Sequence, residues 1–405
     1  MSNTKLTLSE LKYLIIAMLI LSSGVMGLDI NLPSLPFIMK YLHTDQANMQ
    51  LSVSLYLLGT FMSILVYGPL SDKYGRKPVM IFGLSLSCIT SFLTMSSHSI
   101  ESFLLFRFVQ GLGAGVCFTL ARTIITDLMQ GEKLANMASY FSMLVSISPL
   151  LAPAVGGYIQ ELFYWQVNFF VLGIIIAILL VAFILFCKET NLNKNPQAFS
   201  LNGIVKNYTY VIKQPIFLGG AIIAGLGSAI NIVFATLGAF IIQIELNYSP
   251  VVYGWAITSI ALVIMLSKII CPYVTQKLGS QKTILFGLIL IFIAGAALLL
   301  GKLLHLIDLG SLMLCVYIAI FGLPFVMLNA MALALSSFAG RRGAANSVYS
   351  SGQHASGFIF SASVSLFSTS GIVPLALTYI TISSLSLICY FTIIDKLTSK
   401  DYRFV

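Results

Sequence analysis

The stretch 68-GPLSDKYGRKP-78 joins two apolar runs at residues 49–70 and 79–95. A membrane-spanning helix requires about 20 mostly apolar residues, and both runs are close to that length. Gly68 and Gly75 permit a tight turn between them, and the charged residues of the stretch favour water over hydrocarbon. The sequence therefore predicts two antiparallel membrane helices joined by a short polar turn.

Runs of the same kind continue along the chain and predict an all-α membrane protein of twelve helices. Their approximate bounds are 11–32, 49–70, 79–95, 102–125, 135–161 and 169–187, followed by 216–246, 251–273, 283–301, 309–338, 344–370 and 372–394. Hydrophobic residues make up 58% of the chain and charged residues only 9%. A soluble domain has about 25% charged residues, and an outer-membrane barrel has short alternating segments, so both classes are excluded.

The net charge of +9 reports orientation and not a nucleic-acid partner, because the basic residues form no patch. Lys40 and Lys302 fall on one side of the predicted helices, Arg107 and Lys268 fall within spans, and the rest of the 22 Lys and Arg residues fall on the other side. Basic residues gather on the cytoplasmic side of membrane proteins. We therefore expect a multi-pass protein of a bacterial inner membrane, with both termini cytoplasmic.

The order of the helices predicts two pseudo-symmetric halves. Residues 1–190 and 215–405 each hold six predicted helices, and the polar segment 191–214 reads as a cytoplasmic linker. The turn KYGRK at 73–77 has a weak counterpart in KLGSQK at 277–282, as expected for a duplication. Paired repeats of this kind are typical of secondary transporters.

Three segments carry a resemblance to a known family. GPLSDKYGRKP, RFVQGLGAG at 107–115 and SPLLAPAVGG at 148–157 resemble, in order, signatures of the major facilitator superfamily. Together with DINLPSLP at 29–36, they resemble the Bcr/CflA group of twelve-span drug:proton antiporters, although Leu28 stands where that group usually has threonine. The resemblance implies substrate:proton antiport by alternating access. The alternative is a dedicated exporter or importer of a siderophore or another metabolite.

Three charged residues fall within the predicted spans. A carboxylate in hydrocarbon is costly, so Asp29 should face a cavity and could couple proton movement; the alternative is a cap on the turn at 33–36. Arg107 cannot release its proton. The resemblance implies that it tunes proton transfer, with Gln110 nearby. The alternative is that it clamps the backbone of the first helix. Lys268 is either a substrate or anion contact or, as the sequence favours, a side chain that extends to the cytoplasmic face.

The turn between the second and third helices can form an ionic cluster. Asp72 can cap a helix N-terminus, and Arg76 can pair with Asp127 at the end of the fourth helix. The resemblance implies that these residues, with Gly68, Gly75 and the eleventh helix near 344, latch the outward-facing state. The alternative is a generic positively charged turn.

The fifth helix should bend and pack closely, because proline removes a helical hydrogen bond and glycine leaves a smooth surface. The residues concerned are Pro149, Pro153, Gly156 and Gly157. Such a bend is compatible with rocking of one half against the other and also with a fixed structural kink.

Polar and aromatic residues deep in spans are candidates for the lining of a substrate cavity, since a buried amide or imidazole needs a partner or water. They are Asn31, Tyr56, Asn231, Phe234, Trp255, Asn329, Gln353 and His354. His354 is as readily explained as an interior histidine with its hydrogen bonds satisfied.

No catalytic or nucleotide-binding motif is found, so an enzyme or a nucleotide-driven pump is not expected. The sequence has no GxxxxGK[ST], GxSxG or HExxH segment, and its six cysteines lie in apolar runs without paired spacing. We expect no metal and no cofactor other than the proton as coupling ion. The expected partners are a small-molecule substrate and membrane lipid, and the expected state is a monomer.

Overall fold

The computed structural model describes residues 8–128, 147–192, 194–196, 198–335, 342–366 and 371–396, and every regular element within these ranges is helical. In chain order they are α1 (Leu8–Asp29), η1 (Leu32–Ser34), α2 (Leu35–Tyr41), α3 (Gln46–Tyr74), α4 (Arg76–Met95), α5 (Ile100–Leu128), α7 (Ile147–Leu162), α8 (Trp165–Phe186), α9 (Leu201–Ile212), α10 (Pro215–Phe240), η2 (Ile241–Glu245), α11 (Pro250–Leu278), α12 (Ser280–Leu303), α13 (Leu309–Leu335), α14 (Arg342–Ser365), α15 (Ile372–Cys389) and η3 (Tyr390–Asp395).

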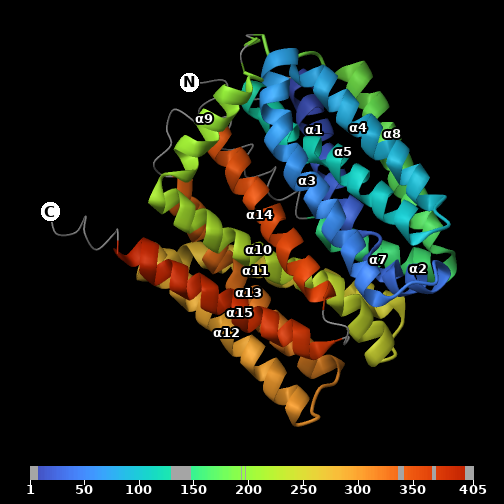
Figure 1. Ribbon diagram of the computed structural model, residues 1–405, viewed down its shortest axis with the longest axis vertical. Helices are drawn as coiled ribbons and strands as arrows, with labels where there is room; N and C mark the ends of the chain where they lie inside the picture. The colour runs from blue at the N-terminus through green and yellow to red at the C-terminus, as the bar shows by residue number, and fades with distance from the viewer. Residues whose placement is uncertain are drawn as a thin grey trace.

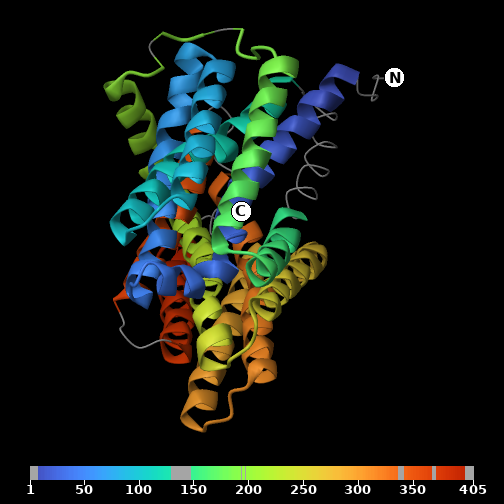
Figure 2. The same cartoon turned by 90° about the vertical axis from the view of Figure 1, so that its right-hand side faces the viewer.

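The helices associate in two groups (Figure 1). In the N-terminal group, α5 packs on α1, α3 and α4, and α8 packs on α1 and α4. In the C-terminal group, α13 packs on α10, α11 and α12, and α15 packs on α10 and α12. The two groups meet where α14 packs on α3 and where α7 packs on α11, and the second pair is also seen side by side in Figure 2. These two contacts, the α3–α14 seam and the α7–α11 seam, hold the two groups in position relative to each other.

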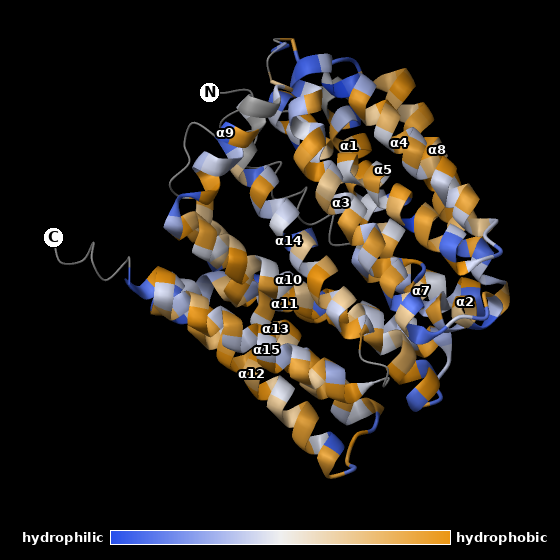
Figure 3. Ribbon diagram, in the orientation of Figure 1, coloured by the Kyte–Doolittle hydropathy of each residue, from blue (hydrophilic) through white to orange (hydrophobic). Residues whose placement is uncertain are grey.

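Ten of the described helices or helix pairs are long and apolar enough to cross a membrane. Two of the twelve predicted spans are not among them. The described part of the fifth begins only at Ile147, because residues 129–146 lie outside the described ranges. The eleventh, α14, is rich in serine and carries an amide and an imidazole; its first half is pale and blue in Figure 3, where α8 is mostly orange.

The outer surface of α8 shows why water is not the solvent for this fold. Phe170, Ile174, Ile178, Val181 and Leu185 recur every three or four residues, and each is 40–69% exposed. On a soluble protein, a contiguous exposed apolar stripe of this length marks a surface that binds a partner or a membrane. On a helix long enough to span a membrane, the stripe is the face that lipid covers. The protein is therefore a multi-pass membrane protein.

The two turns that the sequence paired share one local conformation. Gly75 between α3 and α4 has φ +109°, and Gly279 between α11 and α12 has φ +79°. Only glycine adopts such angles without strain. Each glycine therefore ends one long helix and begins the next.

The first span differs from its predicted range of 11–32. The chain passes through η1 and continues as α2, so the span-length segment reaches from Leu11 to Tyr41. Pro33 and Pro36 do not interrupt the helices η1 and α2, because each lies in the first turn of its helix, where a missing N–H group costs no hydrogen bond. The predicted turn at 33–36 is therefore helical and continues the first span.

The predicted linker at 191–214 also differs, because it contains the helix α9. Its first turn is capped by the Ser200 hydroxyl, which accepts a hydrogen bond from the Gly203 N–H group. Tyr208 and Val211 lie on one face of α9; Val211 is fully buried, and the Tyr208 hydroxyl donates to the Leu65 carbonyl of α3 at 2.9 Å. The polar composition of the segment concealed this helical spacing.

Candidate functional site

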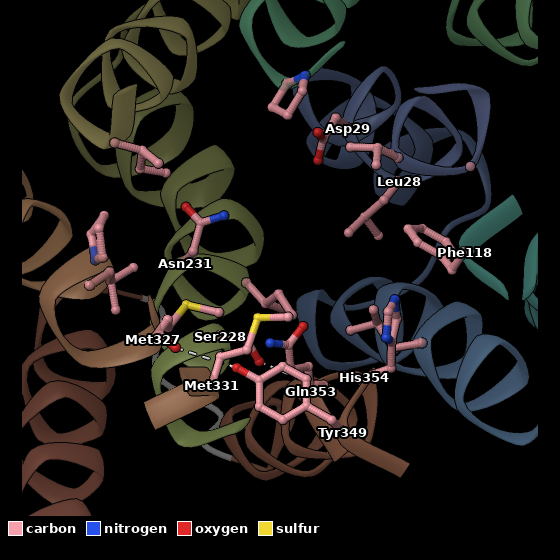
Figure 4. Close-up of a pocket in the computed structure, with 18 of the residues that line it drawn as sticks. Leu28, Asp29, Phe118, Ser228, Asn231, Met327, Met331, Tyr349, Gln353 and His354 are labelled. Carbon is pink, nitrogen blue, oxygen red and sulfur yellow. Dashed lines mark hydrogen bonds between the residues drawn. The ribbon is translucent and has the colours of Figure 1, made fainter. Parts of the chain in front are cut away.

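A cavity of about 400 Å³ lies between the two groups of helices (Figure 4). Its walls come from α1, α3, α5 and α7 on one side and from α10, α11, α13 and α14 on the other, and they are mostly apolar. The polar side chains on the walls are Asp29, Tyr56, Ser228, Asn231, Lys268, Tyr349, Gln353 and His354. A mainly apolar cavity of this size with a few convergent polar groups suits a small amphipathic molecule.

Asp29 is the last residue of α1, and its carboxylate faces the cavity. It does not cap the following turn: Asn31 and Ser34 occupy the N-cap positions of η1 and α2, and neither turn has a side-chain cap. Within the described residues, Asp29 has no ion pair and no side-chain hydrogen bond. An ionisable group in this setting is available to protons and to ligands.

Arg107 is 2% exposed and lies behind α1, not on the cavity wall. Its guanidinium donates to the Gly27 carbonyl oxygen at 3.0 Å and to Gln110 Oε1 at 2.6 Å. It also stacks over the Tyr56 ring at 4.6 Å, which contributes a cation–π interaction. The geometry is that of a clamp on the backbone of α1, two residues before Asp29.

Lys268 lies on the cavity wall and is exposed, and its extension to the cytoplasmic face stays a prediction. The helix α11 continues for ten residues beyond it, so the cavity is nearer than the helix end. Asn231 from α10 and Gln353 from α14 face the same cavity. His354 also lines it, with Nδ1 2.9 Å from the Ser350 carbonyl oxygen.

Two of the predicted cavity residues are instead buried among the C-terminal helices. Phe234 has no exposed surface and belongs to the apolar core. Asn329 is 4% exposed and faces α11, where its Oδ1 accepts from the Thr275 hydroxyl at 3.2 Å while its Nδ2 donates to the Phe325 carbonyl at 2.9 Å. Both side chains therefore contact the surrounding helices and not the cavity.

Two others lie toward the end of the molecule where α7 meets α8, which we call the far end. Trp255 is 53% exposed, and its indole N–H donates to the Tyr158 hydroxyl of α7 at 3.2 Å. Asn31 is 2% exposed and donates to the Gly27 carbonyl at 3.4 Å. Neither lines the cavity, although both lie beside the helix contacts that close it.

The sequence analysis missed most of the apolar lining and two polar residues, Ser228 and Tyr349. Ser228 lies one helical turn before Asn231, and Tyr349 lies one turn before Gln353. The Ser228 hydroxyl donates to the Gln353 backbone carbonyl at 3.0 Å. Extending each predicted residue by one turn along the same face would have found both.

The far end is closed by close contact between α7 and α11. A Cβ atom on Gly157 would lie 2.7 Å from the Pro250 carbonyl oxygen, and one on Gly254 would lie 2.6 Å from the Pro153 carbonyl oxygen. Small residues permit such approach of membrane helices. The glycines of α7 thus serve packing.

Further contacts extend this closure. Gln243 Nε2 donates to the Pro33 carbonyl oxygen at 3.0 Å, and the Thr258 hydroxyl donates to the Leu150 carbonyl oxygen at 2.7 Å. Gly156 packs within the N-terminal group, where an added Cβ would lie 2.0 Å from the Ile30 carbonyl oxygen. Pro149 lies at the opposite end of α7 and lines the cavity.

Gly254→Leu is expected to open the far end. Overpacking costs about 1–3 kcal/mol, which would reduce the closed population about tenfold. The measurement is disulfide formation between cysteines placed at Tyr158 and Trp255, whose side chains touch across α7 and α11. Gly352→Leu is the matched control, because nothing lies within 4 Å of an added Cβ there. Unchanged cross-linking in Gly254→Leu would mean that the glycine contact does not hold the far end shut.

The turn between α3 and α4 forms the predicted ionic cluster. Arg76 Nε lies 3.1 Å from Asp127 Oδ2, and the same guanidinium pairs with Asp72 and donates to the Ser71 hydroxyl at 2.7 Å. A Cβ atom on Gly68 would lie 3.6 Å from Ser347 Oγ of α14. The cluster therefore lies next to the seam between α3 and α14. The side chain of residue 344, which was expected to take part, lies outside the described residues.

Glu189, which the sequence analysis did not single out, ties the linker to this turn. Its carboxylate accepts hydrogen bonds from the N–H groups of Arg76 at 2.8 Å and Lys77 at 3.0 Å, at the start of α4. Burial disfavours its charge, but N–H donors from Asn191, Arg76, Lys77 and Thr190 outweigh that effect and lower the pKa of the carboxyl below its ordinary value. A carboxylate at a helix N-terminus is also favoured by the helix dipole.

Comparisons with known proteins cover nearly the whole chain. The model of the Major Facilitator Superfamily matches residues 16–361. A "Bicyclomycin resistance protein homolog" from Haemophilus influenzae is 29% identical over 93% of this chain and 94% of its own length. A "Multidrug resistance protein MdtL" from Shewanella sp. is 29% identical over 80% of both chains.

Solved structures of low sequence identity share the fold. A mutant form of the nucleoside transporter NupG superposes with a TM-score of 0.72 at 13% identity, covering 95% of this chain and 98% of that one. The xylose transporter XylE from E. coli, in a partially occluded inward-open conformation, gives a TM-score of 0.72 at 12% identity, covering 95% and 97%.

Proposed function

Because the chain belongs to the Major Facilitator Superfamily, and is thus a transporter and not an enzyme, we propose that it exports small amphipathic, drug-like compounds in exchange for protons. The predicted superfamily is confirmed, and relatives named for bicyclomycin and multidrug resistance agree with the predicted group. One observation carries the proposal: an unpaired carboxylate, Asp29, faces a mostly apolar cavity between two groups of helices.

The proposed architecture has twelve spans in two halves, 1–190 and 215–405, joined by 191–214. The contacts at the far end support a state whose cavity is closed on that side. In the opposite state, the α7–α11 contact separates, while the contact of α3 with α14 near Gly68 is kept and the Arg76 cluster acts as the latch. The seams seen in the structure are the surfaces that such rocking would use.

The proposed mechanism uses competition at Asp29. Cargo binds while the carboxylate is ionised and the cavity faces the cytoplasm; a proton arriving from the outside neutralises Asp29 and releases the cargo. The membrane potential supplies about 2.3 kcal/mol per charge per 100 mV. Arg107 holds the α1 backbone next to Asp29 and so fixes where the carboxylate lies. No cofactor beyond the proton takes part in the proposed cycle.

The proposed setting is a monomer in a bacterial inner membrane, with both termini in the cytoplasm and lipid around the exposed apolar faces. The cavity lies within one chain, so a second copy is not required for a complete site.

Proton movement on addition of substrate tests the proposal. The full-length protein in liposomes with a trapped pH dye is expected to move protons when lipophilic cations, neutral drugs or zwitterionic drugs are added. Protein-free liposomes and a protonophore are the controls. Proton movement with siderophores alone would replace drug export by the metabolite alternative, and no movement with any compound would contradict proton-coupled transport.

A further inference from the structure

The cavity presents two full charges of opposite sign on different walls. Asp29 belongs to α1 of the N-terminal group, and Lys268 belongs to α11 of the C-terminal group. They are the only acidic and the only Lys or Arg side chains among the described lining residues. A charge on an apolar wall needs a counter-charge or water.

Neither charge is neutralised by a protein partner that the structure describes. The recorded ion pairs, at distances up to 4.0 Å, involve Arg76 and Lys302 and not Lys268 or Asp29. Arg107, which holds the α1 backbone two residues before Asp29, donates to Gly27 and Gln110. His354 lies against the Ser350 carbonyl of its own helix. Both charges are therefore open to a ligand in the cavity.

The wall between the charges is apolar and adaptable. Met327 and Met331 of α13 and Phe118 of α5 line the cavity, and Figure 4 shows Met331 beside Gln353 and Ser228. Methionine side chains repack around ligands of different shape. Specificity must then come from the charges more than from the outline of the cavity.

We propose that the cargo is a zwitterionic amphiphile, whose anionic group binds Lys268 and whose ammonium group binds Asp29. The inference rests on the proposed function and names its substrate class. The ammonium group competes with the proton for Asp29, as exchange requires, while the anionic group satisfies Lys268.

Cargo of a single charge fits less well. A lipophilic cation would leave Lys268 unmatched and repelled across the cavity, and an anion would be repelled by ionised Asp29. An anion would also bind best when Asp29 carries a proton, so that proton and cargo would travel together and not in exchange. Only a molecule with both charges satisfies both walls and keeps the exchange.

The test compares three forms of one scaffold, driven by a proton gradient in liposomes containing the full-length protein. The probes are a zwitterionic fluoroquinolone, its ethyl ester, which keeps only the cation, and its N-acetyl derivative, which keeps only the anion. A second triplet is built on an α-amino cephalosporin. The zwitterion is expected to be carried about tenfold faster than either derivative, the usual effect of a charge-assisted contact.

Lys268→Gln is expected to remove the advantage of the zwitterion over its ester, and the ester itself should not be slowed, because the variant also removes the charge that repels it. Lys268→Arg should keep the preference, because it keeps the charge. Lys277→Gln, on the same helix but exposed near its end, is the matched control. The wild-type comparison of the three forms needs no variant and stands even if a variant fails to fold.

Equal transport of ester and zwitterion by the wild type would overturn the inference, as would a Lys268→Gln variant that slows all three forms alike. Transport of lipophilic cations alone would overturn it while leaving drug export intact. If the wild type carries no compound of any charge, the proposed function fails first, and this inference fails with it.

Discussion

Asp29→Asn is expected to reduce substrate-driven proton movement to the level of protein-free liposomes. The amide has nearly the shape of the carboxylate but cannot exchange a proton, and the described structure offers no other acid on the cavity wall. Binding of cargo should survive in part, because the apolar wall is unchanged. The measurement is dye-reported proton movement alongside equilibrium binding of the same compound.

Two variants make this result specific to the position. Asp29→Glu should retain coupling, because it keeps the carboxyl group. Glu101→Gln removes an exposed carboxylate at the start of α5 and should behave as the wild type does. Normal proton movement in Asp29→Asn would show that Asp29 is structural and that coupling lies elsewhere.

Arg107→Met is expected to abolish transport and to lower the melting temperature in detergent. It leaves the Gln110 amide oxygen without its buried donor, at a cost of about 1–3 kcal/mol, and leaves the Gly27 carbonyl with only the longer hydrogen bond from Asn31. It also frees α1 to shift beside Asp29. Thermal unfolding and transport are measured on the same preparation.

Arg107→Lys separates the clamp from a purely electrostatic role. Lysine keeps the charge but lacks the planar fork that reaches two acceptors, so a clamp predicts loss of both stability and transport. If Arg107→Lys transports normally, the positive charge and not the clamp is what matters. Lys277→Met, which removes an exposed basic residue, should leave the melting temperature unchanged.

The sequence predicted the helices better than their rotation. The glycine turn at 75 and the apolar runs identify the spans, because length and hydropathy alone decide whether a helix crosses a membrane. The additional helices α2 and α9 were missed since Pro33 reads equally well as an end or a start, and since α9 has a polar composition. Hydropathy does not resolve either case.

The site was predicted in part for the same reason. Asp29, Asn231 and Gln353 line the cavity, while Phe234 of α10 and Asn329 of α13 do not. An intramembrane polar residue must find a partner, but the partner can be a neighbouring helix as well as a cavity, and the choice depends on the rotation of each helix.

The carboxylate of Glu189 has a consequence for biosynthesis. It completes the N-terminus of α4 across 113 residues of sequence, so the ribosome makes the helix long before it makes the cap. At about 5–20 residues per second, the α3–α4 turn waits on the order of ten seconds for its last hydrogen-bond acceptor. During that interval the newly inserted helices lack the group that completes the turn between them, and the N-terminal bundle can be finished only after Glu189 emerges.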